Sequence, residues 1–203
     1  MKAVILGGGF GSRLGNLTKF KPKSLLKIKR KTILEWQIIQ LKKNGIKDIF
    51  INTHYFHNQF KLNVKKLTKL GIKIHLKYQK RLNGTAGAVK IFEKELIKER
   101  NFFVIYGDVL FRESFREIKR FHNAKNSLCT IYVHYRKISN SKVIFSQKNG
   151  EVLSFHERPS KEKKKLSKHK INKNIGVNSG IYLLNSEILN MIPSNEFVDF
   201  PKN

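Results

Sequence analysis

The chain has 203 residues, of which 40% are apolar, so a disordered chain is excluded and one domain with a sizeable core is expected. Lys and Arg outnumber Asp and Glu by 42 to 14, and the net charge is +28. This excess is mostly lysine, is spread along the chain and lacks the interleaved aromatic residues of a nucleic-acid-binding surface, although its field would attract an anionic substrate.

Two further features bear on the compartment. The chain has one cysteine, Cys129, so no disulfide can form within it, and we expect a small buried apolar side chain there. No apolar stretch approaches the ~18 residues of a membrane span, and the run after Lys2 is too short for a secretory signal. We therefore expect a cytoplasmic protein that does not enter membranes.

The densest basic run, residues 161–170, is interpreted as a solvated surface loop.

Strands and helices alternate in the first half of the chain. Strands are expected over residues 2–6, 48–53, 72–79 and 101–106, and helices over residues 32–41, 57–70 and 86–98. Thr32 and Glu35 form a capping box at the start of the first helix, and Gly45 and Gly71 end the first two. This alternation predicts an α/β fold, a doubly wound and mainly parallel sheet covered by helices, which binds ligands at the carboxyl ends of its strands.

After about residue 125 the sequence becomes rich in strands. They are expected over residues 128–135, 142–146, 151–156 and 175–184, with a hairpin turn at Asn149-Gly150 and a short helix over residues 186–192 that ends before Pro193. No repeat or linker separates the two parts. We therefore expect a single domain over residues 1–203, with one half up to residue 125 and a strand-rich half over residues 126–203.

A glycine-rich segment follows the first strand. Residues 7–14 read Gly-Gly-Gly-Phe-Gly-Ser-Arg-Leu, and Thr18 and the sequence Pro-Lys-Ser-Leu-Leu at residues 22–26 come next. Closely spaced glycines let a backbone turn tightly and approach a ligand. Arg13 and Lys23 are suited to phosphate oxygens. These residues predict a site for a nucleoside triphosphate; the alternative is a tight turn with solvated basic side chains.

Two common phosphate-binding patterns do not match this segment. The dinucleotide fingerprint Gly-x-Gly-x-x-Gly would end on Ser12 or Leu14, and the P-loop would have Ser12 at its second glycine. The order that is present resembles the sugar-phosphate nucleotidyltransferases, which join a sugar 1-phosphate to a nucleotide and release pyrophosphate. The resemblance implies a Rossmann-like fold with a nucleotide-binding half and a strand-rich sugar-phosphate-binding side. It also implies a role in nucleotide-sugar and cell-surface polysaccharide biosynthesis, and it leaves room for a homo-oligomer.

The resemblance assigns the catalytic residues. Arg13 would stabilise the triphosphate and the leaving pyrophosphate, and Lys23 would hold the α-phosphate and the attacking oxygen. Asp108, in Tyr-Gly-Asp at the end of an apolar strand, would hold Mg²⁺, which proteins bind with one or two carboxylates plus substrate phosphates. The alternative for Asp108 is a turn residue bonded to its own backbone.

The resemblance also implies a set of nucleotide contacts. They are Leu6, Gly7, Gly8, Gly9, Gly11, Ser12, Arg13, Gln79, Gly84 and Thr85. Gln79 would read the base edge, and its amide suits thymine or uracil because it both donates and accepts. The alternative for Gln79 is a polar residue at the end of a strand. The Gly-Thr-Ala-Gly sequence that begins at Gly84 is instead similar to the mannose-1-phosphate guanylyltransferase branch, as is the Asn-Thr-His-Tyr sequence that begins at Asn52, so the base stays open. Thr85 is expected to cap the following helix.

The sugar-phosphate side follows from the same resemblance. Glu157 and Arg158 stand where relatives carry Glu-Lys, and Asn178 belongs to a strand that lines the sugar pocket. Ser141-Lys142 replaces the Tyr-Gly that relatives commonly have before the next strand. His54 and His57, three positions apart, lack a third ligand at a suitable spacing for zinc, so a surface or capping role is expected.

Asp199-Phe200-Pro201-Lys202 resembles a family segment that precedes the last strands. Relatives continue and supply a second metal-binding aspartate there. Three explanations are open: a fragment, a naturally short and impaired protein, or another carboxylate that substitutes. Two alternative functions follow, a non-catalytic nucleotide-binding homologue and, favoured by charge alone, a nucleic-acid-binding protein.

Overall fold

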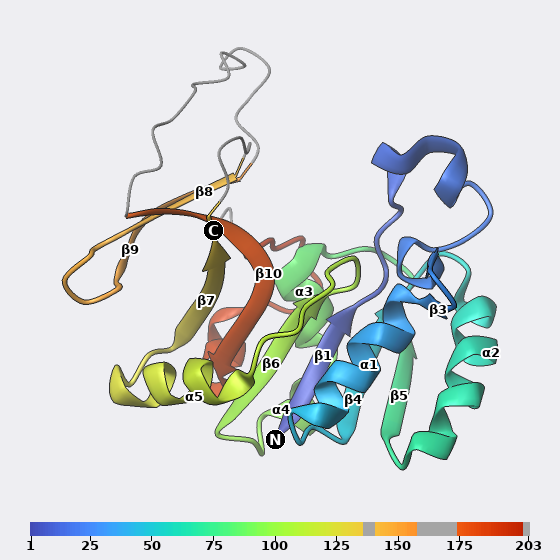
Figure 1. Ribbon diagram of the computed structural model, residues 1–203, viewed down its shortest axis with the longest axis horizontal. Coiled ribbons are helices and arrows are strands. Elements are labelled where there is room, and N and C mark those ends of the chain that lie inside the picture. Colours follow the sequence, from blue (N-terminus) through green and yellow to red (C-terminus); the bar gives the residue numbers. More distant parts are fainter. Residues whose placement is uncertain (136–140, 158–173, 201–203) are drawn as a thin grey trace.

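The computed structural model describes residues 1–135, 141–157 and 174–200 (Figure 1). Its centre is an eight-stranded sheet in the order β5-β4-β1-β6-β10-β8-β9, with β7 also paired to β10. The four strands of the parallel part are β1 (Lys2–Leu6), β4 (Asp48–Thr53), β5 (Lys73–Tyr78) and β6 (Asn101–Tyr106). Each lies within one residue of its expected bounds, which confirms the α/β class.

The second half of the chain extends this sheet with antiparallel strands. They are β7 (Cys129–His134), β8 (Ser141–Phe145), β9 (Val152–Glu157) and β10 (Ile175–Asn185). The long strand β10 joins the two halves, because its carboxyl part lies between β6 and β7 while its first residues pair with β8. The ladder shifts register between Asn178 and Ile181, and Gly180 there has a φ of 70°.

Helices cover both faces of the sheet, as alternation along the strands requires. The helices α1 (Ile33–Lys43), α2 (His57–Leu67) and α5 (Phe115–Ala124) pack on the face that carries Ala3 and Ile5. The helices α3 (Gly84–Lys90) and α4 (Glu93–Leu96) pack on the face that carries Val4, together with the 3-10 helix η5 (Ser186–Met191). Successive side chains of β1 thus enter two separate cores.

The start of α1 is set by the capping box expected from the sequence. The Glu35 amide donates to the Thr32 hydroxyl at 3.1 Å, and the Thr32 amide donates to the Glu35 carboxylate. The turn at Gly45, with a φ of 77°, ends the helix and leads into β4. A minor two-stranded ribbon, β2 (Lys27–Ile28) with β3 (Lys31–Thr32), precedes α1.

Two sequence expectations about this fold were wrong, and one helix was missed. The helix expected over residues 86–98 is two helices, because the backbone turns at Phe92 and buries that side chain against Phe50, with ring centroids 5.4 Å apart. No helix was expected over Phe115–Ala124, where three inward-facing residues suffice to hold α5 on the sheet. Cys129, expected to be buried, is exposed at the start of β7.

No helix in the described ranges is both long enough and apolar enough to cross a bilayer. The basic run over residues 161–170 lies outside the described residues.

Candidate nucleotide-binding site

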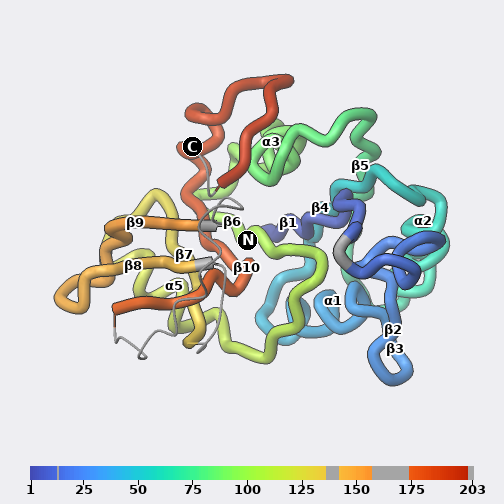
Figure 2. Tube along the Cα trace, turned by 90° about the horizontal axis from the view of Figure 1, so that it is seen from above, coloured from blue at the N-terminus to red at the C-terminus, as the bar shows by residue number. Residues whose placement is uncertain are grey.

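The carboxyl ends of the parallel strands bring the sequence motifs together. The glycine loop follows β1, Gln79 follows β5 and Asp108 follows β6 by two residues, and these strands are neighbours through β4 (Figures 1 and 2). Parallel strands end at one edge of the sheet, so residues far apart in the sequence meet there.

Glycine is favoured at different positions of the loop for different physical reasons. A Cβ on Gly7 would lie 2.9 Å from the Asn52 carbonyl oxygen, and one on Gly8 would lie 2.7 Å from the Asn52 side chain. Both positions require glycine, because a side chain there would collide with β4. Gly11 has a φ of 66°, which favours glycine. A Cβ on Gly9 would meet no described atom within 4 Å. Gly9 therefore leaves open surface that a ligand can approach.

Thr18 of the motif closes this loop. Its hydroxyl donates to the Gly11 carbonyl oxygen at 3.0 Å and to that of Gly15 at 3.3 Å, at the end of the 3-10 helix η1 (Ser12–Thr18). Phe10 projects from the loop with half of its surface exposed and contacts His54 and Tyr55 edge-on. The loop is thus tied both to itself and to the end of β4.

Lys23 and Asp108 meet across the site. Lys23 begins the 3-10 helix η2 (Lys23–Leu25), and its Nζ lies 2.6 Å from the Asp108 carboxylate. About a third of each side chain is exposed. The turn before Asp108 requires glycine, because a Cβ on Gly107 would lie 2.4 Å from the Leu6 carbonyl oxygen and 2.6 Å from the Ser24 hydroxyl. The cation predicted to bind phosphate and the carboxylate predicted to bind the metal therefore lie side by side.

Asp108 fits Mg²⁺ only in partnership with a substrate. Within the described ranges no three His, Cys, Asp or Glu side chains cluster as a metal site. One carboxylate plus phosphate oxygens is an ordinary donor set for Mg²⁺. An ion arriving with a triphosphate would replace Lys23 as the counter-charge of Asp108, which would release Lys23 to a phosphate.

Gln37 supports the Asp108 turn and was missed by the sequence reasoning. It lies on the apolar face of α1, is 1% exposed, and donates from Nε2 to the carbonyl oxygens of Tyr106 and Val109 at 2.8 Å each. A polar residue among buried apolar positions was the signal in the sequence, but its partners, about 70 residues away, were not visible there.

Gln79, which the sequence predicts to read the base, is buried after β5, and Asn52 holds its side chain. The Asn52 amide links the backbone of Gly7 to the side chain of Gln79 through two hydrogen bonds of 3.0 Å. The backbone of Gln79 is fixed by Thr53 and by the His54 ring, at 2.8 and 2.7 Å. Asn52 was known from the sequence only as part of a resemblance, without a role.

The two histidines near this point support the structure. His54 Nδ1 donates to the Gln79 carbonyl oxygen, and His57 shares a hydrogen bond with the Thr53 hydroxyl at 2.7 Å. Burial, and secondarily the charge of Lys61, lower the pKa of His57. The expected surface or capping role of the pair becomes a positioning role around Gln79.

The segment Asn195–Phe200 fastens the start of α3. Asp199 accepts hydrogen bonds from the Thr85 amide at 2.9 Å and hydroxyl at 3.1 Å, and the Val198 carbonyl oxygen accepts from the Ala86 amide at 2.9 Å. Figure 2 shows this last part of the chain, in red, beside α3. The expectation that Thr85 caps α3 was wrong, because Asn83 holds the N-cap position and Asp199 supplies the acceptor.

On the sugar-phosphate side, the described residues include only part of the expected set. Asn178 accepts from the Gly180 amide at 2.8 Å and donates to the Tyr182 hydroxyl at 2.6 Å. Arg158 lies outside the described residues, and for Arg13 and Glu157 the structure describes the backbone alone. Their roles stay predictions.

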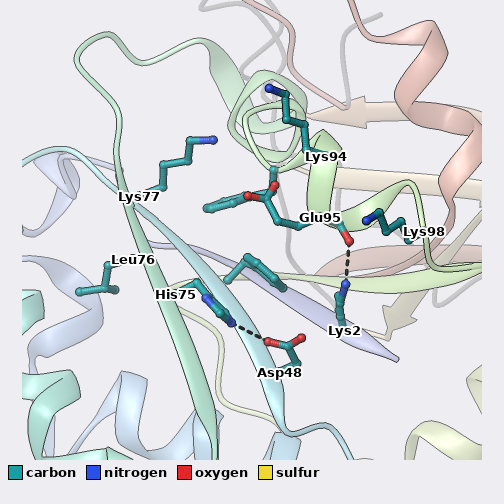
Figure 3. Close-up of a pocket in the computed structure, with 10 residues that line it drawn as sticks. Lys2, Asp48, His75, Leu76, Lys77, Lys94, Glu95 and Lys98 are labelled. Atoms are coloured by element: carbon teal, nitrogen blue, oxygen red, sulfur yellow. Dashed lines mark hydrogen bonds and ion pairs between the residues drawn. The ribbon is translucent and has the colours of Figure 1, made fainter.

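A hollow of about 420 Å³ lies elsewhere, between the amino ends of the strands and α4 (Figure 3). Its wall includes Lys2, Asp48, His75, Lys94 and Lys98. His75 Nε2 and Asp48 are 2.8 Å apart, and Lys2 donates to the Glu95 carbonyl oxygen at 2.7 Å. None of the residues predicted to bind substrate lines it.

Known proteins resemble this chain in sequence. A family model described as nucleotidyl transferase matches residues 2–201. The mannose-1-phosphate guanylyltransferase catalytic subunit beta of Xenopus tropicalis is 31% identical over 199 residues, which are 95% of this chain and 52% of that protein. A UTP–glucose-1-phosphate uridylyltransferase of Synechocystis is 26% identical over 220 residues, covering 100% of this chain and 55% of that protein. The chain thus spans about half the length of these relatives.

Solved structures share the fold. HddC from Yersinia pseudotuberculosis superposes with a TM-score of 0.79 at 22% identity, over 100% of this chain and 84% of that one. A putative glucose-1-phosphate thymidylyltransferase from Bacillus anthracis superposes with a TM-score of 0.74 at 25% identity, over 94% and 73% of the two chains.

Proposed function

Because this chain belongs to the nucleotidyl transferase family, we propose that it transfers a nucleotidyl group from a nucleoside triphosphate to a sugar 1-phosphate. The products are a nucleotide sugar, a donor for polysaccharide biosynthesis, and pyrophosphate. The relatives named for mannose 1-phosphate and glucose 1-phosphate support this substrate class.

One observation carries the proposal: the ion pair of Lys23 and Asp108 beside the glycine loop. The loop offers open backbone at Gly9, and Nζ of Lys23 lies 2.6 Å from the carboxylate. A triphosphate in the loop would meet both groups at the same sheet edge. A solvated turn would not require Gly107 and Gln37 to hold the carboxylate in place.

The chemistry is an in-line displacement at the α-phosphorus. A phosphate oxygen of the sugar 1-phosphate forms a bond to the α-phosphorus. At the same time the bond between the α-phosphorus and the oxygen that bridges it to the β-phosphate breaks, and pyrophosphate leaves with the electron pair. No covalent intermediate with the protein is needed, so catalysis rests on positioning and charge neutralisation.

Each residue then has a part in the proposal. Lys23 holds the α-phosphate and the attacking oxygen, and Arg13 neutralises the leaving pyrophosphate. Mg²⁺ on Asp108 would supply further charge neutralisation when bound with the triphosphate. Glu157 and Asn178 would accept and donate to the sugar, and Arg158 would meet its phosphate.

The test measures pyrophosphate release from a panel of triphosphates and sugar 1-phosphates. The variant Asp108→Asn should lower the release at least a hundred-fold while keeping the fold, because it removes the metal-binding charge. The matched control is Asp48→Asn, at the opposite end of the sheet, which should retain activity. Full activity of Asp108→Asn would refute the metal assignment.

A second candidate is a nucleotide-binding homologue without turnover. The pairing of Asp108 with Lys23 at 2.6 Å favours it, because the carboxylate predicted to hold the metal is neutralised by the protein itself. Calorimetry that shows triphosphate binding, together with no pyrophosphate from any substrate pair, would select this candidate over the enzyme.

A further inference from the structure

The hollow at the amino ends of the strands is lined mainly by cations. Its volume of about 420 Å³ lies within the range of small-molecule sites. Four of its lining residues are lysines, namely Lys2, Lys77, Lys94 and Lys98. They come from β1, from β5 and from α4 with the turn that follows it, and Figure 3 shows them around Glu95. Three segments of the chain therefore bring positive charge to one hollow.

Three of these lysines carry a charge that no described carboxylate neutralises. Lys77 donates to the Ile91 carbonyl oxygen at 2.5 Å, a neutral partner that fixes the ammonium group and leaves its charge in place. The side chains of Lys94 and Lys98 form no hydrogen bond or ion pair with any described residue. These two are four positions apart, a spacing that puts both on one side of a helical turn. The hollow thus has a positive potential that attracts anions.

The acidic residues of the wall leave this charge in place. Asp48 pairs with His75 at 2.8 Å, and Glu95 forms no ion pair with a described residue. One carboxylate oxygen of Glu95, Oε2, is buried and has no hydrogen-bond partner in the described part of the chain. A buried acceptor without a donor is costly. The hollow therefore lacks a donor for Glu95 as well as an anion for the lysines.

Aromatic rings of the core hold two of the lysines in place. The Nζ of Lys2 lies 5.8 Å from the centre of the Phe50 ring, and that of Lys77 lies 5.7 Å from the centre of the Phe92 ring. Both rings are buried and contact each other. Side chains that are already ordered lose less conformational entropy when a ligand binds.

Protection of a sheet edge explains only part of this arrangement. Lysines on an edge strand prevent it from pairing with another chain, and Lys73 and Lys77 on the edge strand β5 fit that role. Lys94 and Lys98 do not belong to an edge strand. Edge protection also gives no reason for a buried oxygen of Glu95 without a donor.

We propose that this hollow binds a small phosphorylated ligand that also carries hydroxyl groups. The phosphate oxygens accept from Lys77, Lys94 and Lys98, and charge-assisted hydrogen bonds of this kind are strong. A hydroxyl group of the ligand donates to the carboxylate of Glu95. The hollow lies at the ends of the strands opposite the glycine loop, so this binding does not rest on the proposed function.

Three probes separate the two requirements. Inorganic phosphate supplies the anion without a sugar, glucose supplies hydroxyl groups without the anion, and glucose 6-phosphate supplies both. Shifts of backbone amide NMR signals in the wild-type chain report where each probe binds, and they require no catalysis. The amides of residues 91–98 should shift saturably with glucose 6-phosphate, with a Kd below about 1 mM.

The other two probes should bind less well at the same place. Inorganic phosphate should bind at least three-fold more weakly than glucose 6-phosphate, and glucose should cause no shift at about 10 mM. Shifts confined to the glycine loop, or none with any probe, would overturn the proposed site. Equal affinities for inorganic phosphate and glucose 6-phosphate would overturn the contact with Glu95.

A double variant tests the cations without touching the core. Lys94→Gln with Lys98→Gln should weaken glucose 6-phosphate binding at least ten-fold, because two charged donors to phosphate are lost. The matched control is Lys65→Gln with Lys69→Gln, which removes two exposed lysines at the same spacing elsewhere. This control should keep the wild-type affinity. Equal losses in the two double variants would reduce the effect to net charge and overturn the site.

The variant Glu95→Leu tests the acceptor. It removes the partner of the ligand hydroxyl and also a negative charge that repels phosphate. The affinity for glucose 6-phosphate should fall to that for inorganic phosphate, whose own affinity should not decrease. Equal weakening of both ligands would refute the hydroxyl contact.

Discussion

At the residue scale, two buried amides outside the glycine motif organise the site. Gln37 holds the turn before Asp108, and Asn52 holds Gln79 against the glycine loop. Both bridge segments that are far apart in the sequence. Motif residues such as Lys23 and Asp108 were predictable because their types and order are distinctive. The supporting amides were not, because their roles exist only once the strands are side by side.

The support by Gln37 has a measurable consequence. Gln37→Leu keeps the size of the side chain but leaves the carbonyl oxygens of Tyr106 and Val109 without their donor. We expect the free energy of unfolding in urea to fall by about 1–3 kcal/mol. The control Gln40→Leu, on the half-exposed side of α1, should change it by less than about 0.5 kcal/mol. Equal effects of the two variants would refute a specific role for Gln37.

At the element scale, the secondary structure follows the local sequence pattern except where tertiary packing determines the bounds of a helix. The capping box of α1 and the glycine turns at Gly45 and Gly71 were read directly from the sequence. The break at Phe92 was not, because it serves the burial of that ring beneath the sheet. Helix α5 was missed because its few inward-facing residues, among charged ones, give a weak periodic signal.

The fastening of α3 by Asp199 gives a prediction about local stability. Asp199→Ala removes the acceptor of the Thr85 amide and hydroxyl. We expect the amides of residues 85–87 to exchange hydrogen about five-fold faster, which corresponds to a loss of about 1 kcal/mol in the local opening free energy. Glu196→Ala, an exposed change in the same segment, should have no such effect. Unchanged exchange in Asp199→Ala would show that Val198 alone holds the helix.

The contact between α5 and β7 predicts a dependence on pH. His122 is 2% exposed and lies 2.8 Å from the Thr130 hydroxyl, and burial, followed by the charge of Arg100, lowers the pKa of its ring. The unfolded chain then binds the proton more readily than the folded one. Stability should therefore fall as the pH drops below about 6.5, the ordinary histidine value.

The comparison that isolates this residue uses His122→Gln, which does not titrate. Between pH 7.5 and pH 5.5 the wild type should lose more unfolding free energy than this variant. Parallel losses in the two proteins would show that His122 does not contribute to the acid sensitivity.

At the scale of the whole molecule, the sheet has a parallel part that carries the phosphate motifs and an antiparallel part joined to it by β10. The alternation of elements predicted the first part, and the hairpin signals predicted the second. The order of the strands was not predictable, because β10 follows β9 in sequence yet pairs with β6, β7 and β8. That pairing brings Asn178 to the same end of the sheet as Tyr106, whose hydroxyl the Tyr182 hydroxyl contacts at 3.2 Å.

The central claim is that the chain transfers a nucleotidyl group, and the fate of the α-phosphate tests it most directly. The wild type should be incubated with Mg²⁺, a sugar 1-phosphate and triphosphates labelled at the α-phosphorus, with GTP, UTP and dTTP tried first. The account predicts that the label appears in a nucleotide sugar while unlabelled pyrophosphate is released in equal amount. Label that stays in the triphosphate, or that appears only in nucleoside mono- or diphosphate, would contradict it.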